Sequence, residues 1–306
     1  MNTLVVKLGA TGDVVRTTPL LRCLEGHVTW ITAAKNVSLL EGLEVPVRAL
    51  TWDERARAAD RAYDLAINLE DDRETALFLR DLKHQRVFGA FVNDEMQVGY
   101  TAEARAWFDM SLISRFGRSE EDRLKLVNRL TYQDLIFKGM GLTFRGEEYL
   151  LPEAPSSALQ GDVAISAVAG AVWPMKKWAY YDELKQELEA RGFTVNVLPT
   201  RPTLLEHLAD VQCHRCLVSG DSLPMHLALG SGLRCVSIFT CTSPWEIHGY
   251  GRQTKVISSL LEEFFYQRGY EERASTAISL EEVLTATLSE LEQSMVSSEL
   301  TRQESR

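Results

Sequence analysis

An α/β fold with two doubly wound, mostly parallel sheets is the architecture that this sequence predicts. Three observations support it: a strand, a glycine loop and a helix at the start of the chain, a repeated strand–helix alternation in both halves, and a linker between the halves. The linker, 151–162 (LPEAPSSALQGD), is rich in proline, serine and glycine. We therefore expect two domains, 1–155 and 156–306, with the functional site in a cleft between them.

The first half alternates short apolar runs with helical patterns. The apolar runs predict strands at 4–8, 27–32, 45–50, 63–69 and 86–91. Apolar residues at helical spacing predict helices at 14–21, 52–62, 73–84 and 124–140. Such alternation favours a mostly parallel sheet that is covered on both faces. The stretch 92–118 is aromatic and irregular, which is more typical of functional loops.

The second half restarts the same alternation after the linker. Strands are predicted at 163–168, 194–198, 216–219 and 234–239. Helices are predicted at 180–191, 203–211, 223–230 and 280–295. The last of these is long and amphipathic, and we expect it to belong to the second domain or to pack back across the cleft.

Composition and charge limit the possible partners. The 306 residues are 45% hydrophobic and 25% charged, which is typical of a soluble globular protein, and the formal net charge of −10 argues against nucleic acid as a partner. No apolar run reaches the ~18 residues of a membrane span, and no secretory signal is recognisable. We expect a cytoplasmic protein with at most peripheral membrane contact.

The opening loop LGATGD, 8–13, is the first candidate for chemistry. Gly9 and Gly12 permit a tight turn, although their spacing is not that of a dinucleotide-binding fingerprint. Asp13 lies at the helix start, where the helix dipole favours a carboxylate. Considered alone, the loop could be a structural turn and Asp13 only a helix cap.

Two further stretches follow predicted strands of the second half. In 167–178 (AVAGAVWPMKKW), small residues and Lys176 precede a helix, which is an arrangement that can hold a diphosphate. In 218–251, Asp221 and Ser222 lie before a helix that carries His226, and a hydroxyl-rich turn follows the next strand. The simpler interpretations are an exposed lysine pair and a histidine of the core.

Together these motifs resemble glycosyltransferase family 9, the ADP-heptose transferases of lipopolysaccharide core assembly. The family's GD and the TLP-like end of its first helix correspond to Gly12–Asp13 and Thr18–Pro19–Leu20, and its K-x-W-P element corresponds to Lys176–Lys177–Trp178–Ala179. Its D-T-G-L-S-H-L-A motif corresponds to 221–228 (DSLPMHLA), its F-G-P-T-x-P turn to 239–244 (FTCTSP), and its P-Y-G to 249–251 (GYG).

The resemblance implies a GT-B fold, in which two Rossmann-like domains with parallel sheets face each other across a cleft. It also implies an inverting, metal-independent transfer of a heptose or related sugar from ADP-heptose to an acceptor hydroxyl, with the nucleotide sugar as a substrate and no cofactor. The first domain would face the acceptor with the loop residues Gly9, Gly12 and Arg16, and Asp13 would be the general base. The second domain would bind the donor through Lys176, Asp221, Ser222, His226, Thr242 and Cys241.

The implied chemistry is consistent with the residue types. Inverting transfer needs one base for the acceptor hydroxyl, and it needs positive charge or N–H dipoles for the departing diphosphate. A carboxylate with a pKa near ~4 is a weak base unless it is desolvated, so we expect domain closure to be part of the mechanism.

Departures from the family pattern affect the donor pocket. Leu223 and Pro224–Met225 replace the family's Gly and Leu-Ser, and Thr240–Cys241 replaces the Gly-Pro of its turn. A different nucleotide sugar is therefore an alternative. So are a saccharide, metabolite or protein acceptor, and a non-catalytic scaffold protein of the same fold.

Four of the five cysteines lie close together in the sequence, at 213, 216, 235 and 241. Cys213, Cys216, Cys235 and Cys241 raise the question of a metal site. If 216–219 and 234–239 are neighbouring parallel strands, Cys216 and Cys235 begin at one edge of the sheet and Cys241 lies at the other. Four-fold coordination is then awkward, so we expect thiols without a metal.

Overall fold

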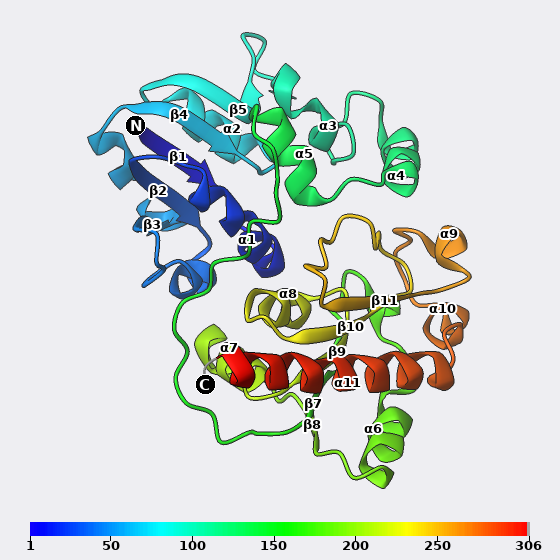
Figure 1. Ribbon diagram of the computed structural model, residues 1–306. Coiled ribbons are helices and arrows are strands. Elements are labelled where there is room, and N and C mark those ends of the chain that lie inside the picture. Colours follow the sequence, from blue (N-terminus) through cyan, green and yellow to red (C-terminus); the bar gives the residue numbers. More distant parts are fainter. Residues whose placement is uncertain (305–306) are drawn as a thin grey trace. The chain divides into compact units, whose positions relative to one another are not determined.

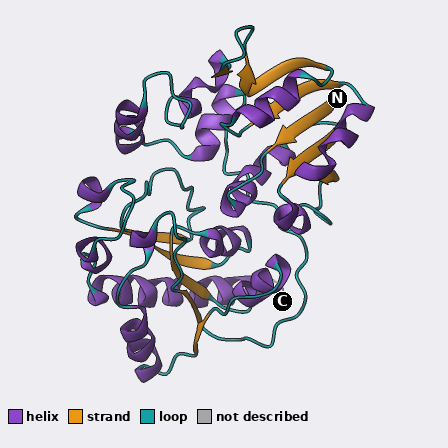
Figure 2. Ribbon diagram, turned by 180° about the vertical axis from the view of Figure 1, so that it is seen from behind, coloured by secondary structure: helices purple, strands orange, loops and turns teal. Residues whose placement is uncertain are grey.

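The computed structural model describes residues 1–304, with side chains described up to residue 295. The chain divides into two compact units, Met1–Glu153 and Ala154–Arg306. Each unit has its strands in one sheet with helices packed outside them (Figure 2). The predicted α/β class with two parallel-sheet units is confirmed.

The first unit contains a six-stranded sheet in the order β3-β2-β1-β4-β5-β6. Its strands β1 to β5 are parallel, and β6 pairs antiparallel with the end of β5. The strand bounds are β1 (Asn2–Val6), β2 (His27–Thr32), β3 (Val47–Thr51), β4 (Tyr63–Asn68), β5 (His84–Val92) and β6 (Val98–Tyr100).

Both faces of this sheet are buried, because successive strand residues belong to opposite hydrophobic clusters. Val5 and Ile67 face one cluster, while Leu4 and Ala66 face the other. A strand that is buried on both faces appears in the sequence as an unbroken apolar run. For this reason the runs at 27–32 and 63–69 located β2 and β4 well.

The helices of the first unit are short, and several are 3-10 helices. Their bounds are α1 (Thr11–Thr17), η1 (Thr18–Arg22), η2 (Ala34–Leu39), η3 (Trp52–Asp60), α2 (Arg73–Arg80), η4 (Ala102–Ala104), α3 (Arg105–Phe108), α4 (Arg118–Val127) and α5 (Tyr132–Gly139). The prediction of one helix over 124–140 was wrong. Asn128 is extended, and the Thr131 side chain accepts a hydrogen bond from the backbone N–H of Asp134, so a new helix begins there.

The second unit contains a five-stranded, fully parallel sheet in the order β11-β10-β9-β7-β8. The strand bounds are β7 (Val163–Ser166), β8 (Val195–Val197), β9 (Cys216–Gly220), β10 (Arg234–Phe239) and β11 (Gln253–Ile257). No strand was predicted at β11, because the strand begins with three consecutive polar residues, Gln253, Thr254 and Lys255, and therefore has only a weak apolar signal.

The helices of the second unit end with one that is much longer than the others. The bounds are η5 (Pro174–Lys176), α6 (Tyr181–Ala190), α7 (Leu204–Gln212), α8 (Leu223–Gly230), α9 (Leu261–Phe264), α10 (Glu272–Thr276) and α11 (Leu280–Glu304). The long helix α11 continues past its predicted end at 295, and it lies along β9, β10 and β11 and against α6 (Figure 1). Within the described part of the chain, no helix is both long and apolar enough to cross a bilayer.

The order of the strands marks one switch point in each sheet. In the first unit β1 lies between β2 and β4, and in the second unit β7 lies between β8 and β9. In each sheet the strand that follows the central strand in sequence is added on one side of it, and later strands are added on the other side. Loops at the carboxyl ends of the two strands flanking such a point diverge, and ligands of open α/β sheets bind there. These points are β1/β4 and β7/β9.

Candidate functional site

At the switch point of the second unit, a lysine and an aspartate from different loops form an ion pair. Lys176 ends η5, which follows β7, and Asp221 directly follows β9. The Lys176 Nζ lies 2.8 Å from Asp221 Oδ2 and also donates to the Asp221 backbone oxygen at 2.9 Å. Both side chains are about one-fifth exposed, at 19% and 18%. A ligand from solvent can therefore reach this pair.

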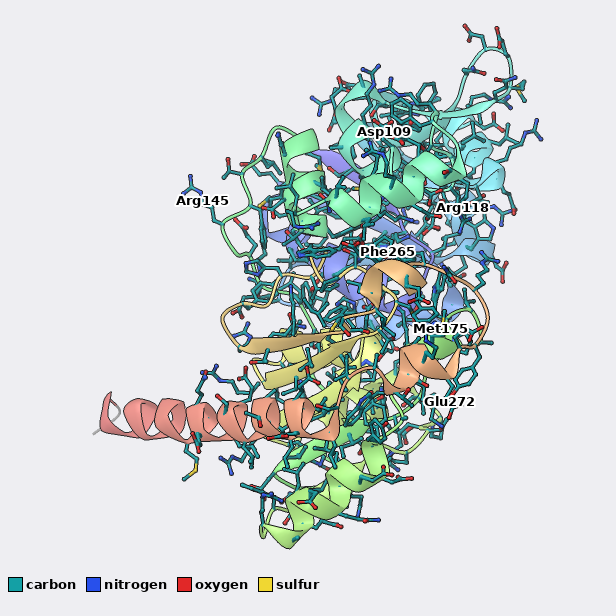
Figure 3. The ribbon with its side chains drawn as sticks, turned by 90° about the vertical axis from the view of Figure 1, so that its right-hand side faces the viewer. Asp109, Arg118, Arg145, Met175, Phe265 and Glu272 are labelled. Carbon is teal, nitrogen blue, oxygen red and sulfur yellow. The ribbon has the colours of Figure 1, made fainter. Side chains whose placement is uncertain are left out.

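The position of Lys176 depends on close packing of η5 against the sheet. A Cβ added to Gly220 would lie only 2.8 Å from the backbone oxygen of Lys176, so the close approach requires glycine there. The Thr240 hydroxyl donates to the backbone oxygen of Met175 at 2.6 Å, which fixes η5 to the end of β10. On its other side η5 contacts α10, and Figure 3 shows Met175 and Glu272 in this part of the unit.

The charge of Lys176 determines the ionisation of Asp221. Burial acts to raise the pKa of the Asp221 carboxyl, but the charge of Lys176 and its hydrogen bond outweigh this effect. With a smaller contribution from His226, the pKa falls to about 2. Asp221 therefore stays ionised at any physiological pH.

Ser222 and His226 lie on the helix that follows Asp221. Ser222 is the N-cap residue of α8, and its hydroxyl donates to the backbone oxygen of Gly220 at 3.3 Å. His226 is 4% exposed and lies close enough to Asp221 to affect its pKa. The structure thus brings Lys176, Asp221, Ser222 and His226 together.

The turn after β10 brings two more predicted residues to this edge in different ways. The Thr242 and Ser243 hydroxyl oxygens are buried, and neither has a well-aligned hydrogen bond within the described part of the chain. Cys241, in contrast, packs in an apolar cluster with Met175, and burial raises the pKa of its thiol. The Cys241 side chain therefore lies in the core of the unit, and its thiol is a poor candidate for contact with a diphosphate.

Lys255 of β11 supports the loop beyond this turn and was not found from the sequence. Its Nζ donates to the backbone oxygens of Pro244 and Ile247 at 2.7 and 2.5 Å. Burial lowers the pKa of Lys255 to about 8. No motif pointed to it, because its two partners are backbone atoms.

At the switch point of the first unit, Asp13 is held within the first turn of α1. Its Oδ2 accepts a hydrogen bond from the backbone N–H of Ala10 at 3.2 Å, and its Oδ1 lies 2.9 Å from Arg16 Nε. The N-cap residue is Ala10, so the cap interpretation of Asp13 needs a correction: the helix begins at Thr11, and Asp13 occupies its third position. Its carboxylate still binds a free N–H group of the helix end.

Gly9 and Gly12 lie in and beside the first turn of α1. Gly12 lies inside α1, and neither glycine has the positive φ that favours this residue type. A Cβ on Gly9 would meet no atom within 4 Å. The backbone φ therefore requires glycine at neither position, and at Gly9 the space does not require it either.

Arg16 connects Asp13 to an aromatic pair. Its guanidinium carbon lies 4.3 Å from the ring centre of Tyr132 and 5.6 Å from that of Trp107, and those two rings contact each other edge to face. The Tyr132 hydroxyl lies 2.8 Å from the Thr17 hydroxyl. The structure thus places part of the irregular stretch 92–118 beside the predicted acceptor loop.

Two charged residues beside this loop were not assigned a role from the sequence. Lys7, the charged residue within the first apolar run, is 8% exposed, and its Nζ lies 3.0 Å from Oε1 of Glu70. Glu70 begins the acidic cluster that follows β4. A lysine within a buried strand was the available signal, since lysine is rarely buried without a partner.

The four cysteines of the second unit lie on different elements, and Cys213 is the C-cap residue of α7. Cys216 begins β9 and Cys235 lies near the start of β10, whereas Cys241 follows the end of β10. Burial raises the pKa of the Cys216 thiol and raises that of Cys235 to about 12. Among the residues that the structure describes, no group of three His, Cys, Asp or Glu side chains is placed to hold a metal ion.

Comparison with known proteins shows which family part of the chain is similar to. The family model of glycosyltransferase family 9 (heptosyltransferase) matches residues 172–274, which include Lys176, Asp221 and His226. No curated protein matches the sequence.

Solved structures share the fold at low sequence identity. A glycosyl transferase family 9 protein from Veillonella parvula is 16% identical, with a TM-score of 0.65 over 95% of this chain and 97% of that one. The E. coli ADP-heptose lps heptosyltransferase II is 16% identical, with a TM-score of 0.60 over 96% and 99%. The E. coli heptosyltransferase WaaC with ADP-2-deoxy-2-fluoro heptose is 13% identical, with a TM-score of 0.52 over 84% and 93%.

The predicted resemblance and the GT-B class of the fold are therefore confirmed, and together they support glycosyltransferase activity. Residues 172–274 match the model of glycosyltransferase family 9 (heptosyltransferase), and the chain shares its two-unit α/β fold with solved structures of that family.

Proposed function

We propose that this protein is an inverting, metal-independent glycosyltransferase that moves a heptose or related sugar from ADP-heptose to an acceptor hydroxyl. The observation that carries the proposal is the Lys176–Asp221 pair at the β7/β9 switch point, inside the segment that matches the family. The relatives solved with ADP or with an ADP-heptose analogue support a nucleotide-sugar donor.

Lys176 is the proposed ligand of the donor diphosphate. In the free protein its charge is neutralised by Asp221, and a diphosphate carries more negative charge than one carboxylate. The Thr242 hydroxyl and the backbone N–H of Leu223, the first residue of α8, can supply further donors. A cation and fixed dipoles can stabilise the departing diphosphate without a divalent metal.

Asp13 is the proposed general base. Its carboxylate is 31% exposed, so an acceptor hydroxyl can reach it, and the Ala10 N–H and Arg16 hold its orientation. The hydroxyl oxygen attacks the anomeric carbon, the bond from that carbon to the diphosphate breaks, and Asp13 takes the hydroxyl proton. The acceptor class stays open between a saccharide, a metabolite and a protein.

The test separates nucleotide binding from transfer. Thermal shifts with ADP, UDP, GDP and dTDP name the nucleotide, because a bound ligand stabilises the folded state by RT ln(1 + [L]/Kd). We expect ADP to give the largest shift and ADP-heptose to be turned over with release of ADP in the presence of EDTA. A larger shift with another nucleotide would replace the donor assignment.

The role of Asp13 as general base is tested by a separate variant. Asp13→Ala should lower turnover by about a hundredfold or more, because a positioned general base typically contributes a factor of 10²–10⁴. Its thermal shift with ADP should match that of the wild type, since Asp13 lies in the other unit. Turnover retained in this variant would refute the role of Asp13 as base.

A further inference from the structure

Lys7 and Glu70 form a buried ion pair that joins the two strands at the switch point of the first unit. Lys7 directly follows β1, and Glu70 lies two residues after β4. The Lys7 Nζ lies 3.0 Å from Glu70 Oε1 and donates to the Leu69 backbone oxygen at 3.4 Å. Their side chains are only 10% and 15% exposed. Two charges this buried are stable only if their pairing and their further hydrogen bonds offset the free energy of desolvation.

The same carboxylate oxygen also holds the loop that leads to Asp13. Glu70 Oε1 accepts hydrogen bonds from the backbone N–H groups of Leu8 at 2.6 Å and Gly9 at 3.3 Å. On the opposite side of the loop, the fully buried Asn36 donates to the Leu8 backbone oxygen at 2.8 Å. The backbone is thus fixed from both sides directly before Ala10, whose N–H binds the Asp13 carboxylate.

The charge of Lys7 acts on Asp13 as well as on Glu70. Burial acts to lower the pKa of Lys7, but Asp13 and Glu70 outweigh this effect and raise it, so Lys7 stays charged. The interaction is reciprocal: a buried cation favours the ionised form of a nearby carboxyl. Besides Lys7, which directly follows β1, the charged or titratable groups near Asp13 are Arg16 of α1 and Tyr132 of α5, while Glu70 holds the loop that leads to it.

We propose that Lys7 and Glu70 are positioning residues for Asp13: Glu70 fixes the backbone of its loop, and Lys7 pairs with Glu70 and places a positive charge behind the loop. The consequence for catalysis rests on the proposed function, in which Asp13 is the base. An ionised Asp13 can accept a proton from the acceptor, whereas a protonated one cannot. Arg16 orients the carboxylate directly, and Lys7 acts from the buried side.

The experiment is a carboxyl-carbon NMR titration of Asp13 in the full-length protein, which needs no substrate. Lys7→Met removes the cation and should raise the pKa of Asp13, because a nearby opposite charge favours the ionised carboxyl. Glu70→Gln keeps the shape and the acceptor oxygen but removes a negative charge. It should therefore shift the pKa of Asp13 in the opposite direction.

Two controls address folding and nonspecific charge effects. Lys7→Arg keeps the charge and should leave the titration near that of the wild type. Lys83→Met removes an exposed lysine near the other end of β4 and should have no effect. If Lys7→Met does not fold, the titration of Asp13 in Glu70→Gln still tests the proposal. A pKa of Asp13 that is unchanged, or that moves in the same direction in both variants, would overturn the proposal.

A second readout connects the pair to turnover. The acid limb of the pH profile of kcat/KM for ADP release from ADP-heptose should move to higher pH in Lys7→Met and to lower pH in Glu70→Gln. The KM for the donor should not change in either variant, because neither residue lies in the second unit. If the wild type releases no ADP, the proposed function fails, while the NMR titration still tests the pair.

Discussion

Replacing Lys176 by Met should release the Asp221 carboxyl from the cation that keeps it ionised. In the wild type the pKa of Asp221 is about 2, against an ordinary value of 3.8. Burial is the largest single influence on this group and acts in the opposite direction. In Lys176→Met burial is opposed only by the smaller effects of His226 and the Thr242 hydroxyl, so we expect the pKa of Asp221 to rise above its ordinary value.

The magnitude follows from the size of the shift. Nearly two pKa units correspond to about 2.5 kcal/mol at about 1.4 kcal/mol per unit, and partial exposure leaves about 2 kcal/mol. Because the folded-state pKa lies below the unfolded-state value of ~3.9, this stability is present above about pH 4 and is lost as the pH falls toward 2. Between pH 5 and 8 it should be constant.

Two measurements check this reasoning. A carboxyl-carbon NMR titration gives the pKa of Asp221, and hydrogen exchange of the β9 amides gives the coupling in a cycle of Lys176→Met, Asp221→Asn and the double variant. Lys185→Met is the matched control, since this partly exposed lysine pairs with Glu189 on α6. A pKa of Asp221 that stays near 2 in Lys176→Met, or a coupling below about 0.5 kcal/mol, would refute the reasoning.

Three further predictions concern the supports of the two sites. Gly220→Ala places a Cβ 2.8 Å from the Lys176 backbone oxygen, so it should displace η5. The affinity for ADP in calorimetric titration should then fall about tenfold or more. An unchanged affinity would contradict the need for close packing of η5 against Gly220. The pKa of Lys255 lies near 8, below its unfolded-state value of ~10.4, so the unfolded state binds more protons between these two pH values. The unfolding free energy of the wild type, measured relative to that of Lys255→Met, should therefore rise by about 2 kcal/mol from pH 8 to 10. A difference that does not change with pH would contradict the burial of Lys255. Thr131→Ala removes the cap of α5 and should cost about 1 kcal/mol in urea unfolding, whereas Thr131→Ser should cost less than half as much.

The sequence located many of the strands because they are buried on both faces. The runs at 27–32 and 234–239 agree with β2 and β10 at both ends, since every residue of such a strand except its first is apolar or otherwise buried. Local signals failed where helices depend on caps and on tertiary packing. The apolar spacing over 124–140 continues across two helices, and Thr131 separates them with a single side-chain hydrogen bond.

For the candidate site, the sequence likewise predicted individual residues but not the contacts between them. Asp13, Lys176 and Asp221 were found from the sequence because each follows a strand within a short motif. The Lys176–Asp221 contact joins positions 45 residues apart, and the contact of Glu70 with the Leu8 N–H joins positions 62 residues apart. Pairing of distant parallel strands creates both contacts, and no local pattern encodes them.

By itself, the sequence determined the class of the fold, the places where loops leave the sheets, and the chemical groups that those loops carry. Apolar runs, glycines and charged residues are local properties of the chain, and they can be recognised without knowing what lies beside them. Only the tertiary structure decided that Lys7 pairs with Glu70, that Arg16 lies over Tyr132, and that Cys241 is buried in the core of its unit. Those outcomes depend on strand order, because the sheet determines which distant loops meet at its carboxyl edge.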